Sequence, residues 1–298
     1  MIVDPRSIKP SEFHTYMLGA IAPRPIALAS TIDKQGRPNL SPFSFFNAFG
    51  SNPPLVIFSP ALRGRDGVAK NTLENLREVD EVVINIVNYN IVQQTSLSST
   101  EYPKGVDEFI KAGLTPLASQ LIKPFRVKES PVNMECKVRE IIQTGVRGGA
   151  ANLVICEIIL MHIDDSVLDS QQKIDPLLID QVARMGGNWY SRAAKGLFEV
   201  PKPLATPGIG IDQLPDTIKN STILTGNDLG MLGNVAQLPI AEELKAFAER
   251  QDILLLLEAL KGDVVNGALA IHIAARQLLA ENKVQEALKL LLIDTLQH

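Results

Sequence analysis

Three basic side chains precede a segment whose pattern predicts a helix. Arg63, Arg65 and Lys70 lead into Asn71 and Thr72, either of which can cap the helix that follows. A helix N-terminus presents unpaired N–H groups and the positive end of the helix dipole, and both favour a bound phosphate. Taken alone, these residues favour a solvated basic loop with an ordinary N-cap, and a phosphate site is the alternative.

A second polar pattern interrupts an aromatic stretch. Residues 39–47 read NLSPFSFFN, so Ser41, Pro42, Ser44 and Asn47 are interspersed among phenylalanines. A proline inside a strand removes a ladder N–H group and marks an edge, a bulge or a site. The segment therefore fits a barrel edge with hydroxyl groups facing solvent, or a wall of hydroxyl and backbone groups against a flat polar ligand.

Other chemical signatures are missing from the sequence. The four histidines are scattered, and the spacing of histidines and cysteines does not suggest zinc or another metal. There is no Gly-x-Ser-x-Gly elbow and no Walker loop. A ligand-binding β-barrel and a globular protein without a visible site are the classes that remain. Redox chemistry on a bound cofactor would need no acid–base cluster from the protein.

The composition narrows the partners and the location. The chain has 298 residues, 45% of them hydrophobic, which suffices for one or two domains. A net charge of −4 gives no basic surface for nucleic acid or an anionic membrane. Cys136 and Cys156 do not make a disulfide scaffold and fit a reducing compartment. With no signal-peptide pattern and no apolar run long enough to span a bilayer, we expect a cytoplasmic protein.

The elements that position these residues are predicted mainly as strands. Apolar runs bounded by turn residues predict strands over residues 24–32, 39–47, 55–59, 81–88, 135–144 and 152–163. His162 lies in the last of them, where a lone histidine is most often a structural residue. Helices are predicted over residues 71–79 and from about residue 240 onward. We expect a first domain over residues 1–198, an irregular linker or wrapping arm over 199–238, and a C-terminal helical extension over 239–298.

Many of these segments, in one order, resemble the signature of the flavin reductase-like FMN-binding split-barrel family, which includes flavoredoxins and flavin reductase domain proteins. The resemblance covers about the first two thirds of the chain. It is carried by Arg24-Pro25-Ile26-Ala27, Ser30-Thr31, Gly36, Asn39, the segment 41–47, Pro53-Pro54, Lys70-Asn71-Thr72, Asn75, residues 82–87 and the late block Arg184-Met185-Gly186-Gly187-Asn188-Trp189-Tyr190.

The resemblance implies a mainly β fold with α-helices, a split β-barrel with flanking helices that forms a homodimer and holds FMN near the interface. It assigns the isoalloxazine and ribityl chain to Ser30, Thr31, Ser44 and Asn47, with backbone groups of Phe43 and Phe45 at the ring edge. It assigns the phosphate to Ser59, Arg65, Lys70, Asn71 and Thr72. Arg24, Asn188 and Tyr190 are further candidate cofactor contacts, and His162 is a candidate nicotinamide contact.

The function implied is an NAD(P)H-dependent flavin (FMN) reductase, an oxidoreductase that passes hydride from NAD(P)H to flavin. The alternative is a flavin-holding electron-transfer or sensor module that has no nicotinamide site of its own and exchanges electrons with a partner protein. A flavin-dependent oxidase on the related pyridoxamine phosphate oxidase barrel fits the order of motifs less well. Leu28 stands where many relatives have a large aromatic residue, so nicotinamide use is less firmly implied than flavin binding.

Overall fold

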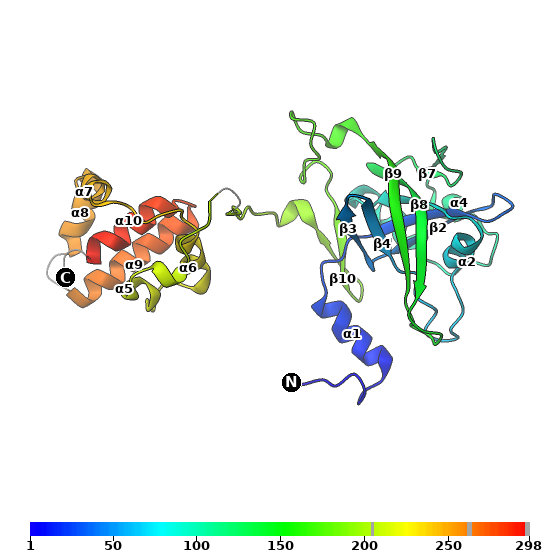
Figure 1. The fold of residues 1–298 in the computed structure, drawn as a ribbon, viewed down its shortest axis with the longest axis horizontal. Coiled ribbons are helices and arrows are strands. Elements are labelled where there is room, and N and C mark those ends of the chain that lie inside the picture. The colour runs from blue at the N-terminus through cyan, green and yellow to red at the C-terminus, as the bar shows by residue number, and fades with distance from the viewer. Residues whose placement is uncertain (204–205, 261–263, 296–298) are drawn as a thin grey trace. The chain divides into compact units, whose positions relative to one another are not determined.

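A computed structural model describes residues 1–203, 206–260 and 264–295. The chain divides into two compact units, Met1–Phe198 and Glu199–His298 (Figure 1). The first unit is built on an antiparallel sheet and the second on helices.

Seven antiparallel strands form the main sheet of the first unit, in the order β2-β1-β5-β8-β9-β4-β3 (Figure 1). Their bounds are β1 Ala27–Ile32, β2 Pro38–Phe43, β3 Phe46–Ser51, β4 Pro54–Phe58, β5 Glu81–Ile86, β8 Val132–Gln143 and β9 Asn152–Ile163. β8 and β9 form a long hairpin whose register shifts at two points. This hairpin lies at the centre of the sheet and joins β5 to β4.

The two edges of this sheet are formed by strands that follow each other in the chain. β2 ends at Phe43 and β3 begins at Phe46, so Ser44 and Phe45 alone join them. Three residue steps reach about 10 Å, whereas the edges of a flat sheet of this width would lie about 29 Å apart. The sheet must therefore curl into a barrel that is split between β2 and β3. Residues 39–47, predicted as one strand, are two strands on opposite edges.

Alternate residues of β1 pack into two different cores. Ala27 and Ala29 belong to a cluster with residues of β4, β5, β8 and β9, which is the barrel interior. Leu28 belongs to a second cluster with Leu40 and Phe109. All six residues of β1 are buried. A strand covered on both faces reads as a continuous apolar run, which is why its position was predictable.

Four helices and two short hairpins flank the barrel. They are α1 Pro10–Ala20, α2 Asn71–Glu78, α3 Val92–Leu97 and α4 Glu108–Ala112, with the strand pairs β6 Pro116–Leu117 with β7 Arg126–Val127, and β10 Val182–Gly186 with β11 Trp189–Arg192. α2 packs on β1 and β2 and buries Leu73 and Leu76. Its position brings the loop over residues 60–70 to the end of the barrel where β4 stops.

The second unit consists of α5 Asp216–Lys219, α6 Gly226–Gly233, α7 Ala241–Ala248, α8 Gln251–Leu260, α9 Val264–Ala280 and α10 Val284–Thr295. The segment 199–238, expected as a linker or wrapping arm, carries α5 and α6 and supplies Leu214, Ile218 and Leu232 to the helical core. Its prolines and glycines hid this role, because short helices separated by turns leave little periodicity. Among the described helices, none is long and apolar enough to cross a membrane.

Candidate functional site

A cavity of about 370 Å³ opens at the N-terminus of α2. Hydroxyl, amide and charged side chains dominate its wall. Its lining comprises Asn39, Ser41, Arg63, Val68, Ala69, Lys70, Asn71, Thr72, Glu74, Ser98, Ser99, Thr100, Glu101, Tyr102, Pro103, Lys104 and Glu108. We call this the α2 cavity. Three of the predicted phosphate residues, Lys70, Asn71 and Thr72, are therefore brought together there.

The first turn of α2 leaves backbone donors available. Lys70 is the N-cap residue, and no side chain caps the helix, so neither Asn71 nor Thr72 is the predicted cap. The N–H groups of Leu73 and Glu74 both donate to the carbonyl oxygen of Lys70. No hydrogen bond within residues 1–203 satisfies the N–H groups of Asn71 and Thr72. These donors and the helix dipole favour an anion.

Side-chain amides fix α2 against the strands beneath it. Nδ2 of Asn39 on β2 donates to Oγ1 of Thr72 at 2.9 Å. Nδ2 of Asn75 donates to Oγ1 of Thr31 on β1 at 3.2 Å. Thr31 and Thr72 are both buried. Thr31, predicted as a flavin contact, therefore uses its hydroxyl group to hold the α2 helix.

Lys70 is a cation without a carboxylate partner. Its Nζ atom lies 5.2 Å from the centroid of the Phe43 ring, within the range of a cation–π contact. No Asp or Glu in the described part of the chain lies within ion-pair distance of it. Burial lowers the pKa of Lys70, and the charge of Glu101, which lines the same cavity, offsets this only in part. An anionic ligand would supply a direct counter-ion.

The two arginines of the preceding loop have different positions. Arg63 lines the α2 cavity and forms looser ion pairs, with Nε 3.6 Å from Oδ1 of Asp66 and Nη1 3.8 Å from Oε2 of Glu101. Arg65 is exposed and is paired with Glu101 and Asp66, and it does not line the cavity. In the sequence, Arg63 and Arg65 are both basic residues of one loop, and nothing in the pattern of charges distinguishes them. Sequence reasoning named Arg65 for the phosphate and missed Arg63.

Two serines of the predicted site are buried with unused hydroxyl groups. Ser59 follows β4, and its Oγ atom is buried without a partner. Its N–H group donates to the carbonyl oxygen of Phe45, which holds the link between β2 and β3 against the end of β4. Ser30 on β1 has no exposed surface, and its Oγ atom also lacks a partner. An unsatisfied buried hydroxyl costs about 1–3 kcal/mol, so Ser59 in particular is suited to a ligand next to it.

The split between β2 and β3 presents the aromatic segment. Phe43 is buried and packs at an angle on Phe58. Ser44 and Phe45 are half-buried, and the Phe45 ring has an edge contact with His14 of α1. Asn47 is exposed, and its Oδ1 atom accepts a hydrogen bond from the N–H group of Ala48. The segment thus has accessible polar groups above a packed aromatic base.

The side chain of Arg24 binds the C-terminal end of α1. Its guanidinium donates to the carbonyl oxygen of Leu18 at 2.6 Å and to that of Ile21 at the C-terminus of α1. Its backbone forms a bridge with Arg184. The side chain is 5% exposed, and burial together with the charge of Arg184 lowers its pKa. The geometry therefore gives Arg24 a structural task at the helix end.

Asn188 and Tyr190 line a second cavity, of about 360 Å³, between α3 and the β10–β11 hairpin. The Arg184 guanidinium lies 4.6 Å from the centroid of the Tyr190 ring. None of the residues that line this cavity lines the α2 cavity. Of the predicted cofactor residues, Lys70, Asn71 and Thr72 line the α2 cavity, Asn188 and Tyr190 line this second cavity, and the others line neither of the two.

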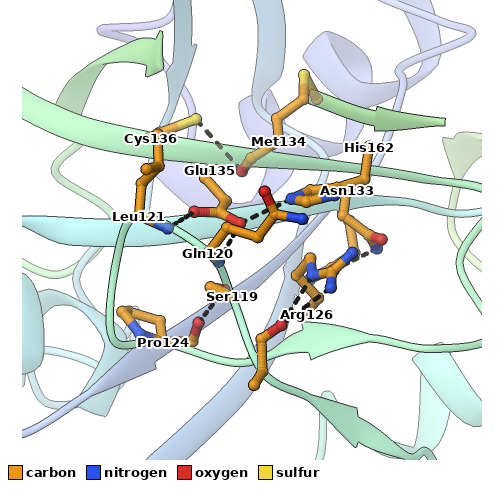
Figure 2. Close-up of polar contacts among 12 residues, drawn as sticks. Ser119, Gln120, Leu121, Pro124, Arg126, Asn133, Met134, Glu135, Cys136 and His162 are labelled. Carbon is orange, nitrogen blue, oxygen red and sulfur yellow. Dashed lines mark hydrogen bonds and ion pairs between the residues drawn. The ribbon is translucent and has the colours of Figure 1, made fainter. Parts of the chain in front are cut away.

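His162 is held by a buried carboxylate (Figure 2). Its Nε2 atom lies 2.7 Å from Oε1 of Glu135, which also accepts hydrogen bonds from the N–H groups of Gln120 and Leu121. Burial acts to raise the pKa of Glu135, but these donors outweigh it and hold the pKa below its usual value. The contact fits the structural role that a histidine in an apolar strand usually has.

Comparison with known proteins places the first unit. Residues 18–185 match the family model of the flavin reductase like domain. An uncharacterised protein of Aquifex aeolicus is 34% identical over 177 residues, which cover 59% of this chain and 88% of that protein. The solved structure of nitrilotriacetate monooxygenase component B from Bacillus cereus superposes with a TM-score of 0.63 at 27% identity and covers 67% of this chain and 98% of that chain.

A protein of Shewanella frigidimarina, assigned as a flavin reductase with a split barrel domain, superposes with a TM-score of 0.57 at 28% identity. The match covers 66% of this chain and 95% of that chain. The predicted fold, a split β-barrel with flanking helices followed by C-terminal helices, is therefore confirmed. The family model ends before the helical unit begins.

Proposed function

The chain belongs to the flavin reductase like domain family, and from this premise we propose that it binds FMN and passes hydride from NAD(P)H to it. The observation that carries the proposal is the environment of Lys70. Lys70 is a half-buried cation with no carboxylate within ion-pair distance in the described chain, at the uncapped N-terminus of α2. A phosphate monoester is the ligand that this arrangement favours.

The residues around Lys70 fit the phosphate end of FMN. The N–H groups of Asn71 and Thr72 point from the first turn of α2, and Arg63 supplies a second positive charge in the same cavity. The unpartnered hydroxyl of Ser59 lies at the end of β4. A dianionic phosphate would satisfy these donors. The bound flavin would supply the hydride-accepting chemistry, which the side chains of the protein do not provide.

The flavin ring is proposed to bind at the split of the barrel, between β2 and β3. Ser44, Phe45 and Asn47 leave polar and backbone groups accessible there, and Phe43 forms the packed base beneath them. Ser30 and Thr31 would support the ring indirectly, because both side chains are buried within β1. The part of Thr31 in the site is to fix β1 relative to α2 and β2 through its hydroxyl group, whereas the Ser30 hydroxyl has no partner within residues 1–203. Arg24 would act in the same indirect way, through α1.

We propose a homodimer as the working unit. Ile159, Met161 and Ile163 alternate along β9 and are each more than a third exposed. Alternate residues of a strand lie on one face, so these side chains form an exposed apolar row on β9. A second copy of the chain would cover this row.

The donor is proposed to be NADH or NADPH. Because Nε2 of His162 contacts Glu135, we assign His162 a structural role rather than a nicotinamide contact. If the flavin is not reduced by either nucleotide, the barrel is instead an electron-transfer or sensor module that receives electrons from a protein partner. These two functions share the FMN site and differ in the source of electrons.

A spectroscopic experiment tests both parts of the proposal. Purified protein is mixed with FMN, freed of excess ligand and scanned, and then given NADH or NADPH without oxygen. Retained flavin bands that bleach within seconds are the expected result. Retention without bleaching under either nucleotide would leave the electron-transfer module. A Lys70→Gln variant is scanned in parallel, and absence of saturable FMN binding by the wild-type chain would overturn the proposal.

A further inference from the structure

The second cavity has a charge that the flavin site does not explain. It is lined by Tyr89, Val92, Gln93, Ser96, Val182, Arg184, Asn188, Tyr190, Ser191 and Arg192. We call it the Arg184 cavity. None of these lining residues is acidic, whereas the lining of the α2 cavity includes three glutamates. The lining therefore has two guanidinium groups and no carboxylate.

The two arginines of this cavity differ in how they are neutralised. Arg192 forms a two-pronged contact with the carboxylate of Asp180, from Nε at 2.9 Å and from Nη2 at 2.6 Å. Arg184 donates from Nη2 to the carbonyl oxygen of Gly187 at 2.6 Å. No carboxylate within residues 1–203 forms an ion pair with Arg184. The net positive charge of the cavity is thus the charge of Arg184.

A second guanidinium adds to this unbalanced charge. Arg24 is bridged to Arg184 through the backbone and is buried without a carboxylate partner in the described chain. Burial, and after it the positive charge of Arg184, lowers the pKa of Arg24. An anion bound at Arg184 would offset this unfavourable interaction between the two positive charges.

The Arg184 side chain is also held in place before any ligand arrives. Its guanidinium stacks over the Tyr190 ring, with 4.6 Å to the ring centroid. Arg192 stacks over the Tyr89 ring across the cavity at 3.8 Å. A guanidinium fixed by stacking loses little entropy when it binds a planar or tetrahedral oxyanion. The amides of Gln93 and Asn188 provide additional hydrogen-bond donors at the wall.

We propose that the Arg184 cavity binds an organic oxyanion, that is, a carboxylate or phosphate group carried on a larger molecule. The volume of about 360 Å³ lies within the range of about 300–1,000 Å³ typical of small-molecule sites, and it exceeds what a lone inorganic anion fills. The Arg184 guanidinium binds the oxyanion, and the amide and hydroxyl groups of the wall bind the rest of the molecule. This site goes beyond the flavin-reducing function and does not depend on it.

Calorimetric titration tests the proposal in a Lys70→Gln background, which removes the cation of the α2 cavity. The probes are benzoate, adenosine 2′,5′-bisphosphate and inorganic phosphate, each at constant ionic strength. We expect saturable binding of benzoate or of the bisphosphate, at least tenfold tighter than inorganic phosphate. Benzoate binding alone would identify a carboxylate ligand, and bisphosphate binding alone a phosphate ligand. Inorganic phosphate as the only probe bound would overturn the claim of an organic ligand.

Substitutions then assign the binding to this cavity. Arg184→Gln should weaken the bound probe about 10- to 100-fold, the effect of losing a charge-assisted hydrogen bond. Arg147→Gln makes the same charge change at the exposed tip of the β8–β9 hairpin and should leave affinity within twofold. Asn188→Ala changes an exposed side chain of the lining, so it should fold even if Arg184→Gln does not, and should weaken binding at least threefold. Equal affinities in all three variants would overturn the site.

Discussion

The Nε2 atom of His162 lies 2.7 Å from Oε1 of Glu135, a carboxylate with no exposed surface (Figure 2). The same carboxylate accepts from the N–H groups of Gln120 and Leu121. Two strands and the loop between β6 and β7 are thus joined at one buried group. His162 acts on the stability of the barrel through this group.

Replacing His162 by glutamine tests this role. The free energy of unfolding should fall by about 1.5–3 kcal/mol, the range for a hydrogen bond to a charged group. The KM for NADH and NADPH should stay within twofold of the wild-type value. Urea unfolding and steady-state kinetics on the same preparation measure the two effects. A KM that rises at unchanged stability would instead assign His162 to the nicotinamide.

Removing the charge of Lys70 should weaken FMN binding selectively. Lys70→Gln loses a charge-assisted hydrogen bond to phosphate, so we expect the Kd for FMN to rise about 10- to 100-fold. The Kd for riboflavin, which lacks the phosphate, should change less than twofold. Fluorescence titration of each flavin measures this. Lys104→Gln is the matched control, because Lys104 lines the same cavity but is paired with Glu74 at 2.8 Å. Equal losses in both variants would contradict the assignment.

Glu108 should make stability depend on pH. Burial raises the pKa of Glu108 above its usual value of 4.5, so the native state binds this proton more tightly than the unfolded chain does. The resulting stabilisation is fully present below about pH 4.5 and is lost as pH rises through the native pKa. Gln at this position still accepts from the N–H group of Leu40 and cannot ionise.

Glu108→Gln should therefore gain stability relative to the wild-type chain as pH rises from 4.5 to 8. Urea unfolding without flavin at each pH measures the difference. A difference that does not vary with pH would show that Glu108 ionises as freely in the native state as in the unfolded chain.

The turn of the β10–β11 hairpin should require glycine at one position and tolerate alanine at the next. Gly186 has a φ of +105°, and a Cβ atom there would lie 3.3 Å from the carbonyl oxygen of Leu18. Gly187 has a φ of +50°, and a Cβ atom would meet nothing within 4 Å. Gly186→Ala should lower the free energy of unfolding by about 3 kcal/mol, the upper end of the range for a strained backbone, and Gly187→Ala by about 1–2 kcal/mol. Thermal unfolding compares them, and equal Tm values would contradict the contact with α1.

The two thiols should be unreactive in the folded protein. Cys136 and Cys156 have no exposed surface, and burial raises the pKa of Cys136 to about 12 and that of Cys156 well above its usual value. An aromatic disulfide reagent at pH 8 should label neither within minutes, because the thiolate is the reactive form. Both should react once guanidinium chloride unfolds the chain. Rapid labelling under native conditions would show that the β8–β9 hairpin opens.

The barrel was predictable where a strand is covered on both faces. The positions of β1, β4 and β5 were predicted from their continuous apolar runs. The break at Ser44 and Phe45 was not predictable, because phenylalanines interspersed with polar residues continue across it. Only the sheet order places β2 and β3 on opposite edges. The segment around α5 and α6 was misjudged because its core residues are spaced by turns rather than by a helical period.

The site was predictable in part from residue types. Lys70, Asn71 and Thr72 are adjacent in the chain, so a helix that begins there brings them together without further information. The choice between Arg63 and Arg65 depends on how the loop folds, and two charges two residues apart give no sign of it. Arg24 and Thr31 have the residue types of a ligand site but form hydrogen bonds to the protein itself.

The strand order also affects how the chain folds during synthesis. β4 is hydrogen-bonded to β9, with Ile57 opposite Ile155. At the usual rate of translation, roughly 5–20 residues per second, β4 waits roughly 5–20 s for this partner strand. During that interval Val56 and Phe58, which are buried in the finished barrel, are exposed on the nascent chain. The N-terminal third thus exposes apolar residues on the ribosome until β9 has been synthesised.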